Sequence, residues 1–364
     1  MDEKKIIRVG AVGTGMIFNR HNKGITKSPD AVLTAICDTD EKMLAKKAEE
    51  CGLTKEQTFT DYRDMLDSGL IDAVLIATPN STHVPIALEA IKRGIPYTVE
   101  KPVGLKVEEV EKLYKATVEA DIKNTVLFAY RFKAAARYAR HIIESGAIGE
   151  IYHVYVEYLQ DYDMRPYSLP TFWRFDEKLA GGGVVYDLSS HMMDLVSFMT
   201  GLEYKSICAS EGNIVASRPD PVTHEMRKVS TDDFHNMIVE FKSGATGTFS
   251  VSKCCMGRKN YQKIQMYGTK GVVIYYLLDN KELEDAIEVC IGDCYMDSYK
   301  FSKLDIPAEY YADQMQGFFD VINGCGDGLT ATIKDGLISQ RMIEKVYESA
   351  EKHSWIDVSD CGNL

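Results

Sequence analysis

A strand, a glycine turn and a helix are predicted by IIRVGAVGTGMIF, residues 6–18. The β-branched and small apolar residues at 6–12 indicate a buried strand, and helical character continues to about Thr26. Gly13, Thr14 and Gly15 lie between them. In this context a glycine turn lets backbone N–H groups and a helix N-terminus approach a pyrophosphate. Phe18 departs from the fingerprint G-x-G-x-x-G of such turns, because the third glycine position of that fingerprint is normally Gly or Ala.

An acidic residue follows the second predicted strand. Residues 31–37 form that strand and Asp38 ends it, at roughly the 20-residue separation from Gly15 expected of the carboxylate that accepts a ribose 2′-OH. A carboxylate there repels a 2′-phosphate, so the pattern favours NAD over NADP. The alternative is a tight turn followed by a strand-end aspartate that caps the next helix.

The first third of the chain alternates short apolar runs with helical segments, which is typical of a doubly wound parallel sheet. Beyond Tyr130 the pattern changes to an Ala-rich helix at 133–145 and then to alternating strands, such as IYHVYVEY at 151–158. We therefore expect an α/β protein, with a Rossmann domain over residues 1–128 and an α/β domain with an open, mostly antiparallel sheet over 129–364. Helices are expected at 310–323 and 334–352, and the last one is a candidate to pack back on the first domain.

Composition narrows the function classes. The 364 residues are 45% hydrophobic and 26% charged, as in soluble globular proteins, and the net charge of −12 disfavours nucleic acid and anionic membrane surfaces. The opening MDEKK lacks the features of a signal peptide, and no apolar run is long enough to span a bilayer, so we expect a cytoplasmic protein. An odd number of cysteines, nine, favours reduced thiols. A zinc site from the pairs Cys254–Cys255 and Cys290–Cys294 is disfavoured by their spacing.

Glu100, Lys101 and Pro102 lie at the end of a predicted parallel strand, where open α/β sheets place ligand contacts. A lysine acts as a base only where burial or a cationic neighbour weakens its hold on the proton. Pro102 restricts Lys101 to an extended backbone and directs the side chain out of the sheet. The alternative is an exposed lysine in an ordinary turn.

A carboxylate and an imidazole follow a glycine triplet. After Gly181–Gly183, Asp187 and His191 stand four residues apart, which places them on one face of a helix. Asp187 can then orient a hydroxyl or a cation while His191 transfers a proton. Two alternatives remain: a buried structural histidine beside a surface aspartate, and a metal site completed by Asp194, which is disfavoured without a further ligand.

Taken together in this order, these motifs resemble the Gfo/Idh/MocA family of NAD(P)-dependent oxidoreductases. Supporting stretches are Ala77–Asn80 with His83, Tyr130–Phe132, and TIKDGL at 332–337. The resemblance implies a Rossmann domain followed by an α/β domain whose sheet often assembles homo-oligomers (dimer, tetramer or hexamer). It also implies that Lys101, Asp187 and His191 are catalytic and surround the reacting carbon of a sugar, polyol or related alcohol. The residues it assigns to the dinucleotide are Gly13, Gly15, Met16, Ile17, Asp38, Thr78, Asn80, His83, Glu100 and Lys101.

The stretch YLQDYDMRPYSLPTFWRF, residues 158–175, combines polar and aromatic side chains that suit a sugar. An interfacial loop would have a similar composition. The predicted substrate-binding residues are Arg131, Tyr158, Asp163, Arg165 and Trp173.

Our leading hypothesis is an NAD-dependent dehydrogenase that acts on a secondary ring hydroxyl of a sugar, glycoside or cyclitol, with C3 of a glucoside as one case. His191 would take the hydroxyl proton while Lys101 stabilises the developing charge and Asp187 orients both, although the sequence equally allows Lys101 and His191 to exchange roles. The first alternative is an NAD-retaining enzyme that cleaves glycosides by transient oxidation and elimination. The second is a non-catalytic, dinucleotide-dependent regulator.

Overall fold

The computed structural model describes residues 6–164, 169–279, 284–291 and 300–364. The described chain forms two compact units. The first extends to Ala129 and includes Ala312–Leu337, and the second comprises Tyr130–Tyr311 and Ile338–Leu364. Residues 312–337 therefore belong to the first unit although they follow most of the second unit in the sequence, and the boundary between the units then falls within the last long helix.

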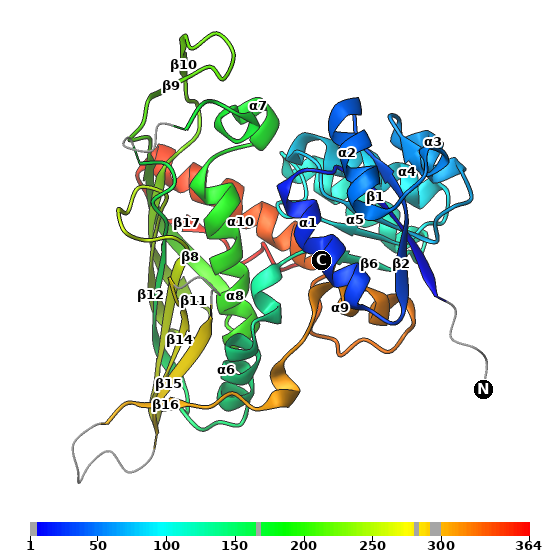
Figure 1. Ribbon diagram of the computed structural model, residues 1–364. Helices are drawn as coiled ribbons and strands as arrows, with labels where there is room; N and C mark the ends of the chain where they lie inside the picture. Colours follow the sequence, from blue (N-terminus) through cyan, green and yellow to red (C-terminus); the bar gives the residue numbers. More distant parts are fainter. Residues whose placement is uncertain (1–5, 165–168, 280–283, 292–299) are drawn as a thin grey trace. The chain divides into compact units, whose positions relative to one another are not determined.

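The first unit is built on a parallel sheet with the strand order β3-β2-β1-β4-β5-β6 (Figure 1). Every adjacent pair of described strands in it runs parallel, and the order reverses direction at β1, as in dinucleotide-binding folds. The strands are β1 (Ile7–Val12), β2 (Ala31–Cys37), β3 (Thr58–Phe59), β4 (Ala73–Ile76), β5 (Tyr97–Val99) and β6 (Asn124–Val126). The helices are α1 (Met16–Lys27), α2 (Glu41–Cys51), α3 (Tyr62–Asp67), α4 (His83–Lys92), α5 (Val107–Glu119), α9 (Gln314–Ile322) and the first turns of α10 (Ile333–Lys352).

This sheet is buried on both faces, because its short strands consist almost entirely of apolar residues. One apolar cluster contains Val74, Ile76 and Val99 with residues of α4 and α5, and the other contains Val9 and Leu75 with residues of α1 and α9. Helix α9 begins at Gln314, four residues later than predicted, since the Asp313 carboxylate accepts hydrogen bonds from the backbone N–H groups of Met315 and Gln316.

Phe18 is part of the second cluster and has no exposed surface. It is the residue that departs from the dinucleotide fingerprint, and the structure gives a reason for its size: its ring fills the core that also contains Phe318 and Phe319 of α9. The small residue that lets α1 approach α9 closely is Gly24, where an added Cβ would lie 2.8 Å from Met315 Cγ.

We expect Phe18→Ala to lower the free energy of unfolding of the first unit by about 3–5 kcal/mol, the cost of removing a fully buried phenyl ring and leaving a cavity. Chemical denaturation followed by circular dichroism measures this effect. The exposed Phe301 provides a matched control, and Phe301→Ala should cost less than about 0.5 kcal/mol. Equal losses in the two variants would show that Phe18 is not a core residue.

The second unit contains a mixed sheet with the order β16-β15-β14-β13-β7-β12-β11-β8-β17 and the separate hairpin β9–β10. β7 and β12 pair in parallel, while the other described pairs are antiparallel. Its strands are β7 (Ile151–Leu159), β8 (Tyr204–Gly212), β9 (Ser217–Pro219), β10 (Met226–Lys228), β11 (Phe234–Phe241), β12 (Thr246–Ser252), β13 (Tyr261–Gly268), β14 (Gly271–Leu277), β15 (Asp285–Ile291), β16 (Ser302–Leu304) and β17 (Ile356–Asp357). The expected fold class, a Rossmann domain followed by an α/β domain with a mostly antiparallel sheet, is confirmed.

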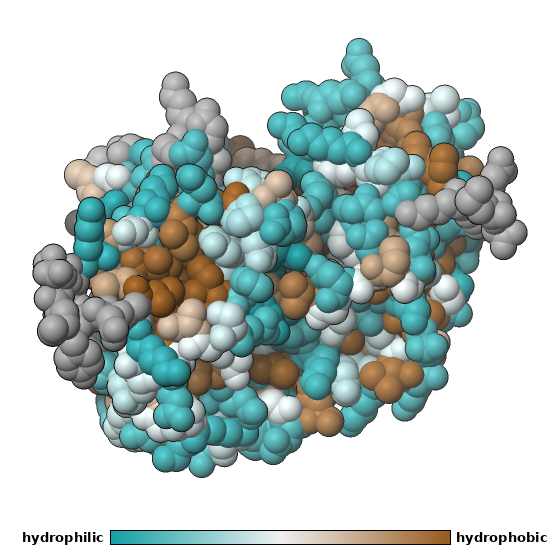
Figure 2. Space-filling model, turned by 90° about the horizontal axis from the view of Figure 1, so that it is seen from below, coloured by the Kyte–Doolittle hydropathy of each residue, from teal (hydrophilic) through white to brown (hydrophobic). Residues whose placement is uncertain are grey.

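Helices α6 (Ala134–Glu144) and α8 (Ser190–Thr200) pack on one face of this sheet, and no helix of the described residues covers the other face (Figure 1). The alternating burial of β7, β11 and β12 follows from this arrangement, since every second side chain points away from the helices. Tyr155 and Ile238 are more than a third exposed. Figure 2 shows one face of the molecule, seen from below, which is mostly polar and carries one larger apolar patch and several smaller ones. Assembly of oligomers through the uncovered sheet face stays a prediction.

The segment after the glycine triplet differs from the regular helix that the sequence predicts. Val185–Ser189 is a π-helical turn, in which Ser190 N–H donates to the carbonyl of Val185, five residues earlier, and α8 starts only at Ser190. Asp187 therefore lies in the π-helical turn, whereas His191 lies in the first turn of α8. The four-residue spacing thus spans two kinds of helix, and π-helical turns of this kind are frequent at functional sites.

Within the described ranges we find no helix with both the length and the apolar character that crossing a bilayer requires. Cys254 and Cys255 are thiols, and Cys294 lies outside the described residues.

Candidate active site

The turn between β1 and α1 has the backbone geometry of a phosphate site. Gly13 has a φ of +89°, and an added Cβ would lie 2.5 Å from the carbonyl oxygen of Ala77, so any larger residue would displace the turn from β4. Gly15 is the N-cap of α1, and space within 4 Å of its missing Cβ is open among the described atoms. Met16 and Ile17, the first residues of the helix, are exposed. The N-terminus of α1 thus presents backbone N–H groups to solvent.

Asp38 lies directly against this turn. One of its carboxylate oxygens accepts hydrogen bonds from the backbone N–H and the hydroxyl of Thr14, both at 2.7 Å, and the other accepts the backbone N–H of Asp40 at 3.0 Å. The sequence placed Asp38 at the end of β2, and the structure brings its carboxylate to the glycine turn. Such a carboxylate is in position to bind a ribose hydroxyl of a dinucleotide whose pyrophosphate lies at α1.

His83 connects two loops at the carboxyl ends of β4 and β5. Its Nε2 lies 2.8 Å from the carbonyl oxygen of Thr78, and its Nδ1 lies 2.9 Å from that of Pro102. Burial lowers the pKa of His83, while the hydrogen bonds to the two carbonyls act in the opposite direction. The imidazole ring of His83 has no exposed surface. Thr78 and Asn80, which the resemblance assigns to the dinucleotide, lie in the loop that the ring supports. We therefore propose that His83 acts on the dinucleotide site by positioning this loop.

The Glu100–Lys101–Pro102 segment is also anchored within the first unit. Glu100 Oε1 lies 2.6 Å from His21 Nε2 of α1. Burial acts to raise the pKa of Glu100, but the hydrogen bond from His21 and the charges of His21 and Lys101 outweigh it and hold the pKa below its ordinary value. Glu100 is therefore a carboxylate, and it connects the lysine segment to the helix that follows the glycine turn. Lys101 is half-buried at the end of β5.

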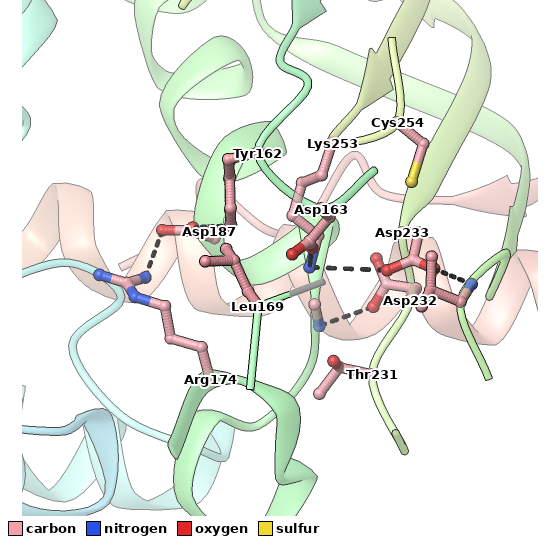
Figure 3. A network of polar contacts seen from close by, with 12 residues as sticks. Tyr162, Asp163, Leu169, Arg174, Asp187, Thr231, Asp232, Asp233, Lys253 and Cys254 are labelled. Carbon is pink, nitrogen blue, oxygen red and sulfur yellow. Dashed lines mark hydrogen bonds and ion pairs between the residues drawn. The ribbon is translucent and has the colours of Figure 1, made fainter. Parts of the chain in front are cut away.

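In the second unit, both carboxylate oxygens of Asp187 are engaged (Figure 3). Arg174 donates to Oδ1 at 2.7 Å, and the Tyr162 hydroxyl donates to Oδ2 at 3.5 Å. Burial, followed by the charge of Asp187, raises the pKa of Tyr162 well above its usual value, so the hydroxyl keeps its proton. The guanidinium of Arg174 in turn lies 4.6 Å from the ring of Trp173. Asp187 is thus a carboxylate of fixed orientation.

His191 borders a network of hydroxyl and amide groups. Its ring packs edge-on against Tyr130, with 4.6 Å between the centroids, and the Tyr130 hydroxyl lies 2.7 Å from that of Tyr158. Tyr158 donates to Asn260 Oδ1 at 2.7 Å, and Gln160 Nε2 donates to the same oxygen at 2.7 Å. Tyr130 lies in the 3₁₀ turn before α6, Tyr158 and Gln160 lie at and just after the end of β7, and Asn260 lies in the loop before β13. Asn260 gives no signal in the sequence, because it is an isolated residue of a turn.

The structure places the other predicted substrate residues differently. Arg131 is buried in an ion pair with both carboxylate oxygens of Asp194. Asp163 is fully buried between Lys253 and Arg218, at 3.0 and 3.1 Å. We therefore propose structural roles for Arg131 and Asp163. Arg165 lies outside the described residues. Arg174, which donates to the Asp187 carboxylate, is a functional candidate that the sequence did not predict. Its position next to Trp173, a predicted substrate-binding residue, is the signal that could have indicated it.

Asp194, considered from the sequence as a metal ligand, is thus the partner of Arg131. Within the described ranges, no group of three or more His, Cys, Asp and Glu side chains could hold a metal ion. Lys101 belongs to the first unit, whereas Asp187 and His191 belong to the second, so each part of the predicted catalytic group is described within its own unit.

Comparison with protein families decides the identity of both units. Residues 7–128 match the model of an oxidoreductase family with an NAD-binding Rossmann fold, and residues 136–274 match the model of the Gfo/Idh/MocA C-terminal domain. The chain belongs to the Gfo/Idh/MocA family. It is therefore an NAD-dependent oxidoreductase, and the glycine turn, with open space at Gly15 and with Asp38 beside it, fits that cofactor.

Individual members of the family are similar over most of the chain. Levoglucosan dehydrogenase from Pseudarthrobacter phenanthrenivorans is 27% identical, over 97% of this chain and 98% of that protein. Myo-inositol 2-dehydrogenase from Thermotoga maritima is 26% identical, over 73% of this chain and 74% of that protein. Among solved structures, levoglucosan dehydrogenase in complex with NADH superposes with a TM-score of 0.88 at 27% identity, over 97% of this chain and 99% of that one.

We expect Asp38→Ala to reduce the preference for NAD over NADP, expressed as the ratio of kcat/KM values, by about tenfold or more, because the variant loses a charged hydrogen-bond acceptor and its repulsion of a 2′-phosphate. Steady-state kinetics with both cofactors measures the ratio. Asp61→Ala is the control, since Asp61 is likewise a carboxylate that accepts a backbone N–H, that of Arg63 at the start of α3. An unchanged ratio in Asp38→Ala would exclude this role for Asp38.

Proposed function

We propose that this enzyme transfers a hydride between NAD and a secondary ring hydroxyl of a sugar, glycoside or cyclitol. The observation that carries the proposal is the fixed carboxylate of Asp187, which Arg174 and Tyr162 hold four residues before His191 in the chain. A carboxylate and a guanidinium can bind neighbouring hydroxyl groups, and this pattern of groups suits a polyhydroxylated ring.

Two further features support this substrate class. The Tyr130, Tyr158, Gln160 and Asn260 network lies beside His191 and offers hydroxyl and amide groups in a buried setting. The relatives named for levoglucosan and for myo-inositol also suggest ring polyols, and the first of them aligns with nearly the entire chain. The particular ring and the carbon that is oxidised, including C3 of a glucoside, remain part of the proposal.

When bound, NAD supplies the acceptor for the hydride. The protein has to bind and orient the alcohol and remove its hydroxyl proton. We propose that His191 takes this proton, with Lys101 placed to stabilise the negative charge that develops on the oxygen. Asp187 does not serve as the base in this scheme, because Arg174 and Tyr162 engage both of its oxygens. Its role is to orient the substrate hydroxyl and the neighbouring cationic groups.

The test is to mix the purified enzyme with NAD and each of levoglucosan, myo-inositol, glucose and an aryl glucoside, and to follow NADH by absorbance. We expect sustained NADH formation with at least one ring polyol. Release of the aglycone from the aryl glucoside without net NADH would favour the NAD-retaining cleavage reaction. No reaction with any member of the panel, combined with tight NAD binding, would favour the regulator.

We expect Lys101→Ala to lower kcat by about 100-fold or more, the typical effect of removing one group that stabilises an oxyanion. NAD affinity, measured by fluorescence titration, should remain within about twofold of the wild type. Lys106→Ala is the control, because Lys106 is an exposed lysine that precedes α5 a few residues further along the chain. Full activity of Lys101→Ala would remove Lys101 from the proposed site.

A further inference from the structure

The glycine triplet before Asp187 has no role in the chemistry described so far, yet each of its residues is constrained by the fold. An added Cβ on Gly182 would lie 2.1 Å from the hydroxyl of Tyr347, and one on Gly183 would lie 1.9 Å from the backbone oxygen of Asp232. Gly181 has a φ of +83°. The triplet therefore lets the main chain pass directly against Asp232 and Tyr347.

Asp232 binds the start of the segment that carries Asp187. Its Oδ1 accepts the backbone N–H of Gly183 at 2.7 Å, its Oδ2 accepts that of Val185 at 3.0 Å, and its backbone oxygen accepts that of Val184 at 3.2 Å. Three consecutive N–H groups at the start of the π-helical turn thus donate to a single residue. These groups have no carbonyl of a preceding helical turn to bind, so the acceptors have to come from elsewhere in the fold.

Asp232 is itself held in place. The Tyr347 hydroxyl, on α10, donates to Oδ1 at 2.6 Å, and the side chain of Asp232 is buried. Figure 3 shows Asp232 next to Asp233, on the side of Asp163 and Lys253 away from Arg174. The contacts of Asp232 and those of Arg174 therefore constrain the Asp187 segment at two points, one on its main chain and one on the carboxylate.

The main-chain contacts continue to Asp187. Its backbone N–H donates to the carbonyl of Gly183 at 2.9 Å, so a displacement of Gly183 displaces Asp187 as well. At the other end of the π-helical turn, the hydroxyl of Ser189 lies 2.9 Å from His235 Nδ1. The position of Asp187 thus depends on the residue that fixes Gly183.

From these contacts we infer that Asp232 is a positioning residue of the reaction, which acts through Gly183 and Val185 to hold Asp187 where it orients the substrate hydroxyl. The inference rests on the proposed function of Asp187. It also explains the glycine triplet, which lets the main chain pass against Asp232 and thereby helps to position Asp187; the triplet has no part in binding the dinucleotide. A displacement of about 1 Å in an orienting group is enough to slow a reaction about 100-fold.

The test is Asp232→Asn. The amide has one acceptor oxygen, so it can bind the N–H of Gly183 or that of Val185 but turns an NH₂ group toward the other. With the panel substrate that the wild type oxidises fastest, we expect kcat to fall by about 10- to 100-fold. The KM and the affinity for NAD should stay within about twofold. Hydrogen exchange followed by mass spectrometry should show faster exchange in peptides that cover residues 183–190.

Asp220→Asn is the control for loss of a buried carboxylate charge: Asp220 Oδ1 accepts the backbone N–H groups of Val222 and Thr223 in the turn between β9 and β10, and Asn keeps that one acceptor oxygen. We expect this variant to keep the wild-type kcat. Tyr347→Phe removes one donor to Asp232 and should give a smaller loss of kcat than Asp232→Asn, and it decides the question if Asp232→Asn fails to fold.

The inference is overturned if kcat and the exchange of residues 183–190 are unchanged in Asp232→Asn, or in Tyr347→Phe where only that variant folds. It is also overturned if Asp220→Asn loses as much kcat as Asp232→Asn, since the effect would then reflect a general loss of stability. A wild type that oxidises no member of the panel counts against the proposed function, and the exchange experiment, which needs no substrate, still tests the contacts of Asp232.

Discussion

Close approach of main chain to main chain is the constraint on which both halves of the proposed site depend. At Gly13 the chain passes against the carbonyl oxygen of Ala77, and at Gly183 it passes against that of Asp232. A side chain at either position would force the turn to move, because its Cβ would lie 2.5 Å from the Ala77 oxygen or 1.9 Å from the Asp232 oxygen, and a backbone carbonyl cannot move without disturbing its own strand or loop. The first approach opens the N-terminus of α1, and the second sets the path of the chain into the π-helical turn.

The charged groups near the proposed chemistry are oriented by partners within their own unit. Glu100 is bound by His21, and Asp187 is bound by Arg174 and Tyr162. Such pairing removes the rotational freedom that a catalytic side chain would have to lose in each turnover, and at Glu100 it also holds the pKa of the carboxyl below its ordinary value. The buried pairs of Arg131 with Asp194 and of Asp163 with Lys253 fix side chains of the framework and leave them enclosed, although burial still raises the pKa of Asp163.

Much of the site could be predicted from the sequence where a function imposes a local pattern. The glycine turn, Asp38 and the Glu100–Lys101–Pro102 segment were recognised because each follows a strand whose apolar run is visible. Arg131 and Asp163 were assigned to the substrate because a charged residue in an aromatic stretch has the same appearance whether it is exposed or paired. Their partners, Asp194 and Lys253, are 63 and 90 residues away, and no local pattern connects them. The parallel pairing of β7 with β12 was missed for the same reason.

The sequence by itself determined the alternation of strands and helices in the first unit, the fold class and the NAD cofactor, since these follow from hydrophobic periodicity and from turns in which only glycine fits. The tertiary structure alone decided that Phe18 is a core residue, that Val185–Ser189 is a π-helical turn and that Asp232 binds its first N–H groups. The physical reason is that burial and hydrogen-bond partnership are properties of residues brought together from distant parts of the chain, whereas periodicity and backbone freedom are properties of neighbours.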